Sequence, residues 1–275
     1  MNKVQGRKEM LYHAKESTVA LETGTMPYIS FGGGEKTLVI IPGLRTSGIE
    51  GSAVFVAWYY RMFAREYTVY LFDRKDALPD RVTIHGLAED TAEAMNRLGL
   101  SNAYVYGASQ GGMIAQDLAV HHPELVKKLV LAVTLSRTNA TAETVIHHWI
   151  DLIERDAVQE MAADYMYKGC SEAYLKRYKA AVPWLTKLQK TMPKDRLLKL
   201  TRSCLTCDTY DQLDRIQCPV LVLGGGKDQI VTGEASLEIA RKLNCEYYIY
   251  EDLSHEAYNE AKDFNQRIYE FFQKP

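Results

Sequence analysis

Short apolar runs alternate with amphipathic stretches along the first half of the chain. Residues 36–43 (KTLVIIPG) and 67–73 (YTVYLFD) are apolar runs typical of strands that are buried on both faces. Residues 53–66 carry apolar positions at helical spacing, and residues 89–99 (EDTAEAMNRLG) predict a helix that Gly99 ends. This alternation predicts a parallel sheet with helices on both faces.

The alternation continues through the middle of the chain and returns near its end. Residues 103–109 (AYVYGAS) and 127–135 (KKLVLAVTL) predict two further strands, and residues 110–122 predict a helix between them. After residue 210 the pattern predicts strand, helix, strand and helix in turn, at 218–228, 233–243, 245–252 and 259–273. The expected fold class is therefore α/β.

Residues 137–210 depart from this alternation, because their pattern is mostly helical. The simplest organisation is an α/β core of residues 1–136 and 211–275 with a helical cap inserted at 137–210. Since the insert lies between two core strands, we expect it to fold over the mouth of a pocket in the core. Its aromatic residues predict an apolar slot there: Trp149, Tyr165 and Trp184.

Composition and charge narrow the classes of partner. A net charge of −2, from 33 Lys and Arg against 35 Asp and Glu, gives no global attraction to nucleic acid or an anionic membrane. The apolar runs are shorter than the ~20 residues needed to span a bilayer, and residues 1–17 lack the apolar core of a secretion signal. We expect a cytoplasmic protein that acts on a small molecule; the sequence leaves the oligomeric state open.

Two sequence features could indicate a metal or nucleotide site, but both are weak evidence for one. Cys204 and Cys207 form a CxxC pair, but no second pair follows at the spacing of a zinc site, so free thiols are expected. The glycine-rich stretches 32–36 (GGGEK) and 224–228 (GGGKD) do not match a phosphate-binding loop. No metal or organic cofactor is expected.

A serine lies among glycines where a predicted strand meets a predicted helix. The stretch from Gly107 to Gly111 matches G-x-S-x-G, the pattern of a nucleophile elbow, with Ser109 at its centre. A serine hydroxyl attacks poorly unless it is exposed beside a base. A tight, strained turn exposes it, and the glycines allow the close approach of chains that such a turn requires. Ser109 is therefore the expected nucleophile.

A serine nucleophile needs a base and a group that orients this base. His255 follows the last predicted strand, in LSHEAYNE, and Asp228 follows the strand before it, in VLVLGGGKD. The carboxyl ends of parallel strands meet at one edge of a sheet. The chain order Ser109, Asp228, His255 also fits this arrangement, so we expect a catalytic triad. His85 precedes a predicted helix and is interpreted as a surface or capping residue, and the remaining histidines lie near the start of the chain, in a helix end or in the insert.

Two backbone amides are expected to stabilise the oxyanion that forms when the serine attacks. Gly43, in IIPGLRTSG, lets the chain after the strand at 36–41 pass close to the site, and the amide of Leu44 is the expected first donor. The amide of Gln110, at the start of the helix after Ser109, is the expected second donor.

Together these motifs resemble the α/β-hydrolase superfamily, in its serine-nucleophile branch with a helical cap. VYGASQGGMIAQDLAVHHPELVKKLVL is similar to that family's strand–elbow–helix–strand block, and VLVLGGGKDQIV and LSHEAYNE are similar to its acid and histidine loops. The resemblance implies an eight-stranded, mostly parallel sheet and hydrolysis through an acyl-enzyme, without a cofactor. Family members often have His-Gly where this chain has Pro42-Gly43, so we expect the hydrogen bonds of that histidine to be lost.

The leading hypothesis is a serine hydrolase that cleaves carboxylic esters of small to medium, apolar substrates. The same triad could instead cleave a C–C, thioester or N-terminal peptide bond. A peptidase would need an acidic residue for the substrate amine, and Glu154, Asp164 and Asp208 are the candidates. A hydrolase-fold ligand-binding protein with little turnover is the remaining alternative, which an intact triad disfavours.

Overall fold

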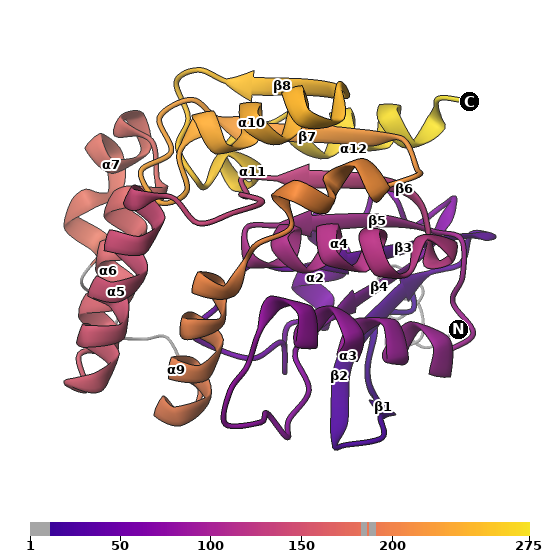
Figure 1. Cartoon of the computed structure of the whole chain (residues 1–275), viewed down its shortest axis with the longest axis horizontal. Helices are drawn as coiled ribbons and strands as arrows, with labels where there is room; N and C mark the ends of the chain where they lie inside the picture. The colour runs from indigo at the N-terminus through magenta and orange to yellow at the C-terminus, as the bar shows by residue number, and fades with distance from the viewer. Residues whose placement is uncertain (1–11, 183–185, 187–190) are drawn as a thin grey trace, which may run out of the picture.

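A computed structural model describes residues 12–182, 186 and 191–275, and its strands form an eight-stranded sheet in the order β1-β2-β4-β3-β5-β6-β7-β8 (Figure 1). The six strands from β3 to β8 run parallel, and β1 and β2 add an antiparallel edge. The eight-stranded, mostly parallel sheet implied by the resemblance is therefore confirmed. The strands are β1 (Lys15–Ala20), β2 (Thr25–Gly32), β3 (Lys36–Ile41), β4 (Tyr67–Phe72), β5 (Ala103–Ala108), β6 (Val126–Ala132), β7 (Val220–Gly225) and β8 (Glu246–Tyr250).

The central strands form where the sequence has continuous apolar runs. Every residue of β5 and of β7 is buried, as expected for strands that helices cover on both faces. β1 is different, because most of its residues are exposed at the edge of the sheet. Its polar sequence, KESTVA, lacks the apolar run that marks the central strands, so the pattern did not predict it as a separate element.

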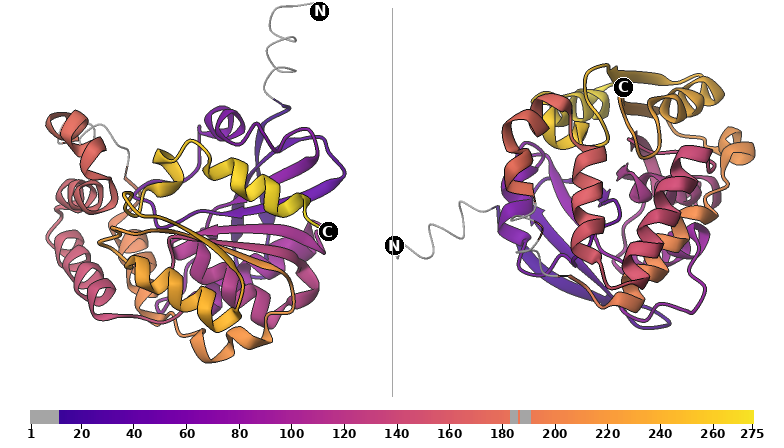
Figure 2. Two further views of the ribbon diagram at one scale, coloured as in Figure 1. Left: turned by 90° about the horizontal axis from the view of Figure 1, so that it is seen from above. Right: turned by 90° about the vertical axis from the view of Figure 1, so that its left-hand side faces the viewer.

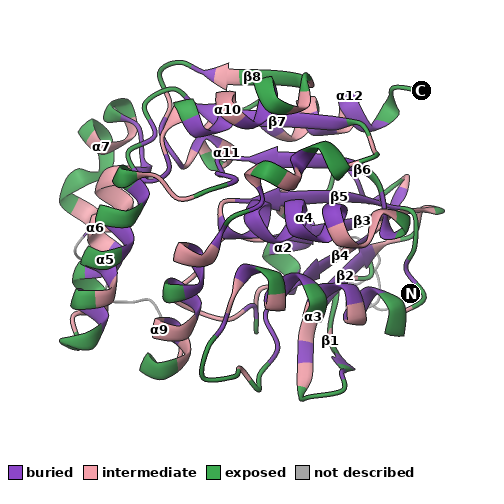
Figure 3. Ribbon diagram, viewed as in Figure 1, coloured by how far each residue is buried: buried purple, intermediate pink, exposed green. Residues whose placement is uncertain are grey.

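Helices cover both faces of the sheet and enclose two apolar cores. Side chains of α3, α4 and α10 pack on one face and those of α2 and α12 on the other. Figure 3 shows the buried strands between helices whose outer sides are exposed. The helices of the core are α2 (Ala53–Tyr59), α3 (Ile84–Arg97), α4 (Gln110–His121), α10 (Gly233–Leu243), α11 (Ala257–Glu260) and α12 (Phe264–Gln273), with the short η1 (Pro123–Leu125).

Helix α3 begins earlier than its apolar pattern indicated. The Thr83 side chain accepts a hydrogen bond from the amide of Gly86 at 3.0 Å and so caps a helix that starts at Ile84, not at residue 89. The prediction that His85 precedes this helix is therefore wrong, because His85 lies in its first turn. Helix α10, by contrast, has the predicted bounds.

A helical insert region lies between β6 and β7. Figures 1 and 2 show most of its helices beyond the carboxyl ends of the parallel strands, where their apolar side chains join one of the two cores. None of the helices in the described part of the chain is both long and apolar enough to cross a membrane. The insert comprises α5 (Ala140–Glu154), α6 (Val158–Gly169), α7 (Glu172–Tyr178), η2 (Lys179–Ala181), α9 (Lys194–Ser203), η3 (Cys204–Thr206) and η4 (Tyr210–Arg215).

Candidate active site

Ser109 lies in a sharp turn between β5 and α4. Its backbone has φ 52° and ψ −121°, a combination that residues with side chains adopt only under strain. The segment at the end of β6 holds this turn through two hydrogen bonds. The Ser109 amide donates to the carbonyl of Ala132 at 2.9 Å, and the Thr134 hydroxyl donates to the Ser109 carbonyl at 2.8 Å. The strained turn directs the serine side chain out of the end of the sheet.

Glycines surround this turn because the backbone segments lie too close for side chains. A Cβ atom added at Gly111 would lie 1.9 Å from the Ile41 carbonyl oxygen, and one added at Gly107 would lie 2.4 Å from the Gly111 carbonyl oxygen. At Gly43 an added Cβ would lie 3.1 Å from the Cβ of Ser109. The loop after β3 therefore passes directly beside the serine.

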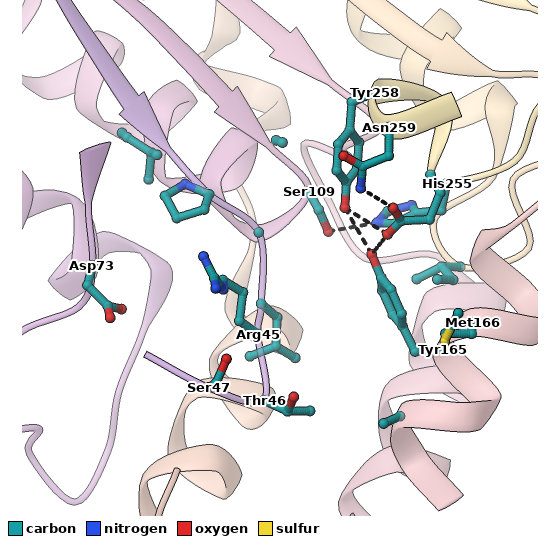
Figure 4. Close-up of a pocket in the computed structure, with 18 of the residues that line it drawn as sticks. Arg45, Thr46, Ser47, Asp73, Ser109, Tyr165, Met166, His255, Tyr258 and Asn259 are labelled. Carbon is teal, nitrogen blue, oxygen red and sulfur yellow. Dashed lines mark hydrogen bonds between the residues drawn. The ribbon is translucent and has the colours of Figure 1, made fainter. Parts of the chain in front are cut away.

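His255 and Asp228 meet Ser109 at the same edge of the sheet, and Figure 4 shows the contact between His255 and Ser109. The Nε2 atom of His255 lies 2.9 Å from Ser109 Oγ, and its Nδ1 atom lies 2.7 Å from Asp228 Oδ2. The other carboxylate oxygen of Asp228 accepts from the amides of Ile230 and Val231, at 2.7 and 3.0 Å. The three residues predicted from sequence thus form one chain of hydrogen bonds, with the carboxylate fixed by its own loop.

Burial and neighbouring charges shift the pKa of His255 in opposite directions. The side chain of His255 is almost completely buried. Burial lowers the pKa of the imidazole because the protonated form loses its hydration. The carboxylates of Asp228 and Glu256 favour the protonated form, and the pKa of His255 is raised above its ordinary value of 6.5 as a result. An imidazole beside a carboxylate is suited to accept a proton.

A cluster of hydroxyl and carboxylate groups, which the sequence analysis missed, joins the cap to the histidine loop. The Tyr165 hydroxyl, on α6, donates to Glu256 Oε1, which also accepts from Tyr258 at 2.8 Å. The Glu256 amide in turn donates to the carbonyl of Gly169 at 2.7 Å. Figure 4 shows Tyr165 and Tyr258 beside His255, so this cluster places the cap against one side of the triad.

The two residues predicted to bind an oxyanion through their amides, Leu44 and Gln110, belong to segments that meet at Ser109. Gln110 is the first residue of α4, so its amide has no acceptor within the helix. Leu44 follows Gly43 in the loop that passes beside Ser109, and it lines the same pocket as the serine. The Gln110 side chain points elsewhere: its amide nitrogen donates to the carbonyl of Leu200 on α9, at 2.8 Å.

Arg74, which the sequence analysis did not identify, gives side-chain support to the loop at Pro42-Gly43. Its Nη2 atom donates to the Pro42 carbonyl at 2.7 Å and to Gln110 Oε1 at 3.0 Å. The guanidinium is buried, which lowers its pKa to about 10, so it stays charged at neutral pH. One arginine thus connects the loop after β3 to the start of α4.

Ser109 and His255 line a cavity of about 1590 Å³ between the core and the insert. Of the three aromatic residues predicted to form a slot, Trp149 and Tyr165 line this cavity, and Trp184 lies outside the described residues. The lining of the cavity combines apolar and polar side chains. Its apolar residues include Met113, Leu135, Ile146, Met161, Ile230 and Val231, and its polar residues include Arg45, Thr46, Ser47, Glu50, Asp73 and Arg196.

None of the three acidic residues considered for binding a substrate amine is placed to do so. Glu154 pairs with Arg202, and Asp164 accepts from the Trp149 indole at 2.7 Å. Asp208 is exposed, and none of the three is among the described residues that line the cavity. Other carboxylates do line it, namely those of Glu50, Asp73, Asp76, Glu256 and Glu260. Those of Glu256 and Glu260, near the triad histidine in sequence, accept hydrogen bonds from protein groups, as do those of Asp73 and Asp76.

The cysteine pair does not resemble a reactive or metal-binding site. Cys204 and Cys207 are free and buried. Burial raises the pKa of Cys204 to about 11 and that of Cys207 further, so both thiols stay protonated near neutral pH. The expectation of free thiols is met at this pair. Cys204 Sγ lies 3.3 Å from the side-chain nitrogen of Gln110 and so belongs to the packing behind the elbow.

Comparison with known proteins assigns the chain to a family. The model of Hydrolase_4, described as serine aminopeptidase, S33, matches residues 35–262. The chain is 25% identical to "Putative carbamate hydrolase RutD" of Rhizobium rhizogenes, over 86% of this chain and 92% of that protein. It is 28% identical to the pimeloyl-[acyl-carrier protein] methyl ester esterase of Vibrio atlanticus, over 69% and 79% of the two chains.

Solved structures share the fold at lower sequence identity. A thermophilic esterase from Thermogutta terrifontis superposes with a TM-score of 0.78 and 19% identity, covering 94% of this chain and 98% of that one. The enol-lactonase from Burkholderia xenovorans LB400 gives a TM-score of 0.79 and 17% identity, covering 94% and 100%. At these identities the likeness establishes the fold alone.

The close contact at Gly111 predicts that Gly111→Ala destabilises the protein. The new methyl group would meet the Ile41 carbonyl at 1.9 Å, so the loop after β3 or the start of α4 must move. We expect a loss of about 1–3 kcal/mol or more in the free energy of unfolding, measured by urea denaturation. Gly33→Ala is the matched control, since a Cβ there meets nothing within 4 Å. Equal stability of the two variants would contradict the packing described here.

Proposed function

We propose that this chain, which belongs to the Hydrolase_4 family of α/β-hydrolases, is a serine hydrolase that cleaves carboxylic esters. One observation carries the proposal: Ser109 Oγ, the His255 imidazole and the Asp228 carboxylate are connected by contacts of 2.9 and 2.7 Å at the wall of a large cavity. This is the constellation that turns a serine hydroxyl into a nucleophile.

In the first half of the proposed reaction, Ser109 Oγ attacks the ester carbonyl carbon while its proton passes to His255 Nε2. Asp228 holds the imidazole in the required tautomer and stabilises the imidazolium. The carbonyl oxygen becomes an oxyanion, which the amides of Leu44 and Gln110 would bind. Arg74 is a positioning residue in this scheme, because it holds the Pro42 carbonyl and the Gln110 side chain together.

In the second half the tetrahedral intermediate collapses and the C–O bond to the alcohol breaks. His255 returns the proton to the departing oxygen, which leaves as a neutral alcohol, and the acyl group stays on Ser109. A water molecule then gives a proton to His255 and attacks the acyl carbon. Collapse of this second intermediate releases the carboxylic acid and restores the serine hydroxyl.

The cavity supports a substrate with one apolar and one polar part. Its volume of about 1590 Å³ exceeds the 300–1,000 Å³ usual for small-molecule pockets, so a medium-sized ester fits. Figure 4 shows Ser109 between Met166 and Tyr165 on the insert side and Arg45 and Ser47 on the other. We propose that the apolar acyl or alcohol group lies toward Met166 and the more polar group toward Arg45.

The carboxylates on the histidine loop favour esters over peptides with a free amino terminus. Glu256 accepts from Tyr165 and Tyr258, and Glu260 accepts from the Ser171 amide at 2.8 Å. A substrate ammonium group at this loop would have to displace these partners. An ester carbonyl is also more reactive toward a serine hydroxyl than an amide carbonyl, because the amide nitrogen shares its lone pair with the C=O group.

The proposed nucleophile predicts the behaviour of Ser109→Ala. The variant should fold as the wild type does but lose ester hydrolysis by about three orders of magnitude or more, because covalent catalysis is removed. We would measure kcat/KM on p-nitrophenyl esters of increasing chain length, together with thioester and amino-acid p-nitroanilide substrates. A fluorophosphonate probe should label the wild type at Ser109 and leave the variant unlabelled.

Ser101→Ala serves as the matched control, since Ser101 is an exposed serine before β5. Labelling of both variants at another residue, or full esterase activity in Ser109→Ala, would contradict the mechanism. A wild type that hydrolyses the anilides faster than every ester would replace the ester assignment with a peptidase. A folded wild type that takes up no probe and hydrolyses no substrate would favour a binding protein.

The raised pKa of His255 predicts the acid limb of the pH profile. Only the singly protonated imidazole can accept the serine proton, so kcat/KM should fall as the pH drops through the pKa of His255 in the free enzyme. Because that pKa is raised, the midpoint should lie above 6.5. A pH series of kcat/KM with a p-nitrophenyl ester, corrected for the titration of p-nitrophenol, measures it.

Glu256→Gln tests the cause of this shift. The glutamine keeps an oxygen that accepts from Tyr165 and Tyr258 but removes the charge that raises the pKa of His255. The midpoint should therefore move to lower pH. A midpoint that stays in place or moves upward would show that the Glu256 charge does not act on His255.

A further inference from the structure

A second cluster of ionisable side chains lies on the surface formed by α3 and α4. It consists of His85 in the first turn of α3 and of Asp117 and His121 on α4. Asp117 and His121 are four residues apart, so they lie on the same side of the helix. Gln110, which begins α4 beside Ser109, is eleven residues before His121, or ~16 Å along the helix axis. The cluster is therefore separate from the proposed catalytic site.

Both imidazoles of the cluster contact one carboxylate oxygen. Asp117 Oδ1 lies 2.8 Å from His85 Nδ1 and 3.1 Å from His121 Nδ1, and His121 Nδ1 also lies 3.0 Å from the Asp117 backbone carbonyl oxygen. The two imidazole rings pack edge to face, with their centroids 4.8 Å apart. No Lys or Arg is among the partners that form an ion pair with Asp117 in the described part of the chain. The Asp117 side chain is only 7% exposed, so a buried carboxylate here contacts imidazoles in place of a basic side chain.

We propose that His85, Asp117 and His121 bind a divalent transition metal ion of the zinc type. Two imidazole nitrogens and one carboxylate oxygen form a common zinc ligand set, and imidazole favours such ions over Mg²⁺ or Ca²⁺. The three ligand atoms lie within 4.8 Å of one another. Bonds of about 2.0–2.1 Å in a tetrahedral site put ligand atoms about 3.3 Å apart. Each nitrogen therefore needs to move only slightly from the oxygen, and the binding of an ion also requires the two imidazoles to turn so that their nitrogens come to this separation from within 4.8 Å.

The burial of the three side chains fits such a site. Asp117 provides a fixed ligand at its base, and His121 is partly covered, with 27% of its side chain exposed. The His85 side chain is 57% exposed and is therefore free to open the space that an ion requires. Water would complete the coordination on this exposed side. The bound ion would connect the start of α3 to the end of α4, which makes its role structural and leaves hydrolysis independent of it.

Isothermal titration of the untagged full chain with Zn²⁺ tests the proposal, because an affinity tag of histidines would itself bind the ion. We expect one Zn²⁺ per chain with a dissociation constant in the micromolar range. His85→Ala and His121→Ala should each weaken binding by about tenfold or more, because each removes one of three ligands. Asp117→Asn, which keeps the side-chain shape, should weaken it likewise. His148→Ala is the matched control, since His148 is an exposed histidine on α5.

Two further measurements distinguish Zn²⁺ bound at this site from Zn²⁺ bound elsewhere on the protein. Zn²⁺ should raise the Tm of the wild type and of His148→Ala but not that of His85→Ala. Co²⁺ in place of Zn²⁺ should give a visible spectrum without thiolate charge-transfer bands, which excludes the cysteines as ligands. Wild-type affinity in either His85→Ala or His121→Ala, thiolate bands, or a wild type that does not bind Zn²⁺ at micromolar concentration would overturn the proposal. Esterase activity is not a readout of this test.

Discussion

The contact between Ser109 Oγ and His255 Nε2 joins two parts of the chain that are 146 residues apart in sequence. It forms only because β5 and β8 end at the same edge of the sheet, with β6 and β7 between them. The strained backbone of Ser109 and the glycines around it bring the hydroxyl to this edge, and the loop after β7 brings Asp228 to the far side of the imidazole. The same geometry thus accounts for the packing of the elbow and for the chemistry proposed at it.

Polar side chains connect the insert and the loop after β3 to the segments that carry Ser109 and His255. Glu256 and Tyr165 connect the histidine loop to α6, and Arg74 connects Pro42 to Gln110. Gln110 also donates to Leu200, so α9 is tied to the residue after the proposed nucleophile. The insert is therefore part of the support for the triad and not only a cover for the cavity.

The sequence predicted what depends on local pattern. The buried strands appear as apolar runs, the elbow as glycines around Ser109, and the positions of Asp228 and His255 follow from the strands before them. The residues that the sequence analysis missed act across large separations. Arg74 lies 32 residues from Pro42, and Tyr165 lies 91 residues from Glu256, so no spacing marks either pair. His85 was interpreted as a surface or capping residue from its place before a predicted helix, and its contact with Asp117 on another helix left no mark in the spacing.

A crystal structure of the protein with a phosphonate ester analogue bound to Ser109 would test the central claim most directly. The tetrahedral phosphorus replaces the attacked carbon, and its free oxygen takes the place of the oxyanion. If the triad and loop act together, that oxygen will lie about 2.7–3.1 Å from the amide nitrogens of Leu44 and Gln110, while His255 keeps its contact with Asp228. An adduct whose oxygen points away from both amides, or a phosphonate bound to a different residue, would contradict it.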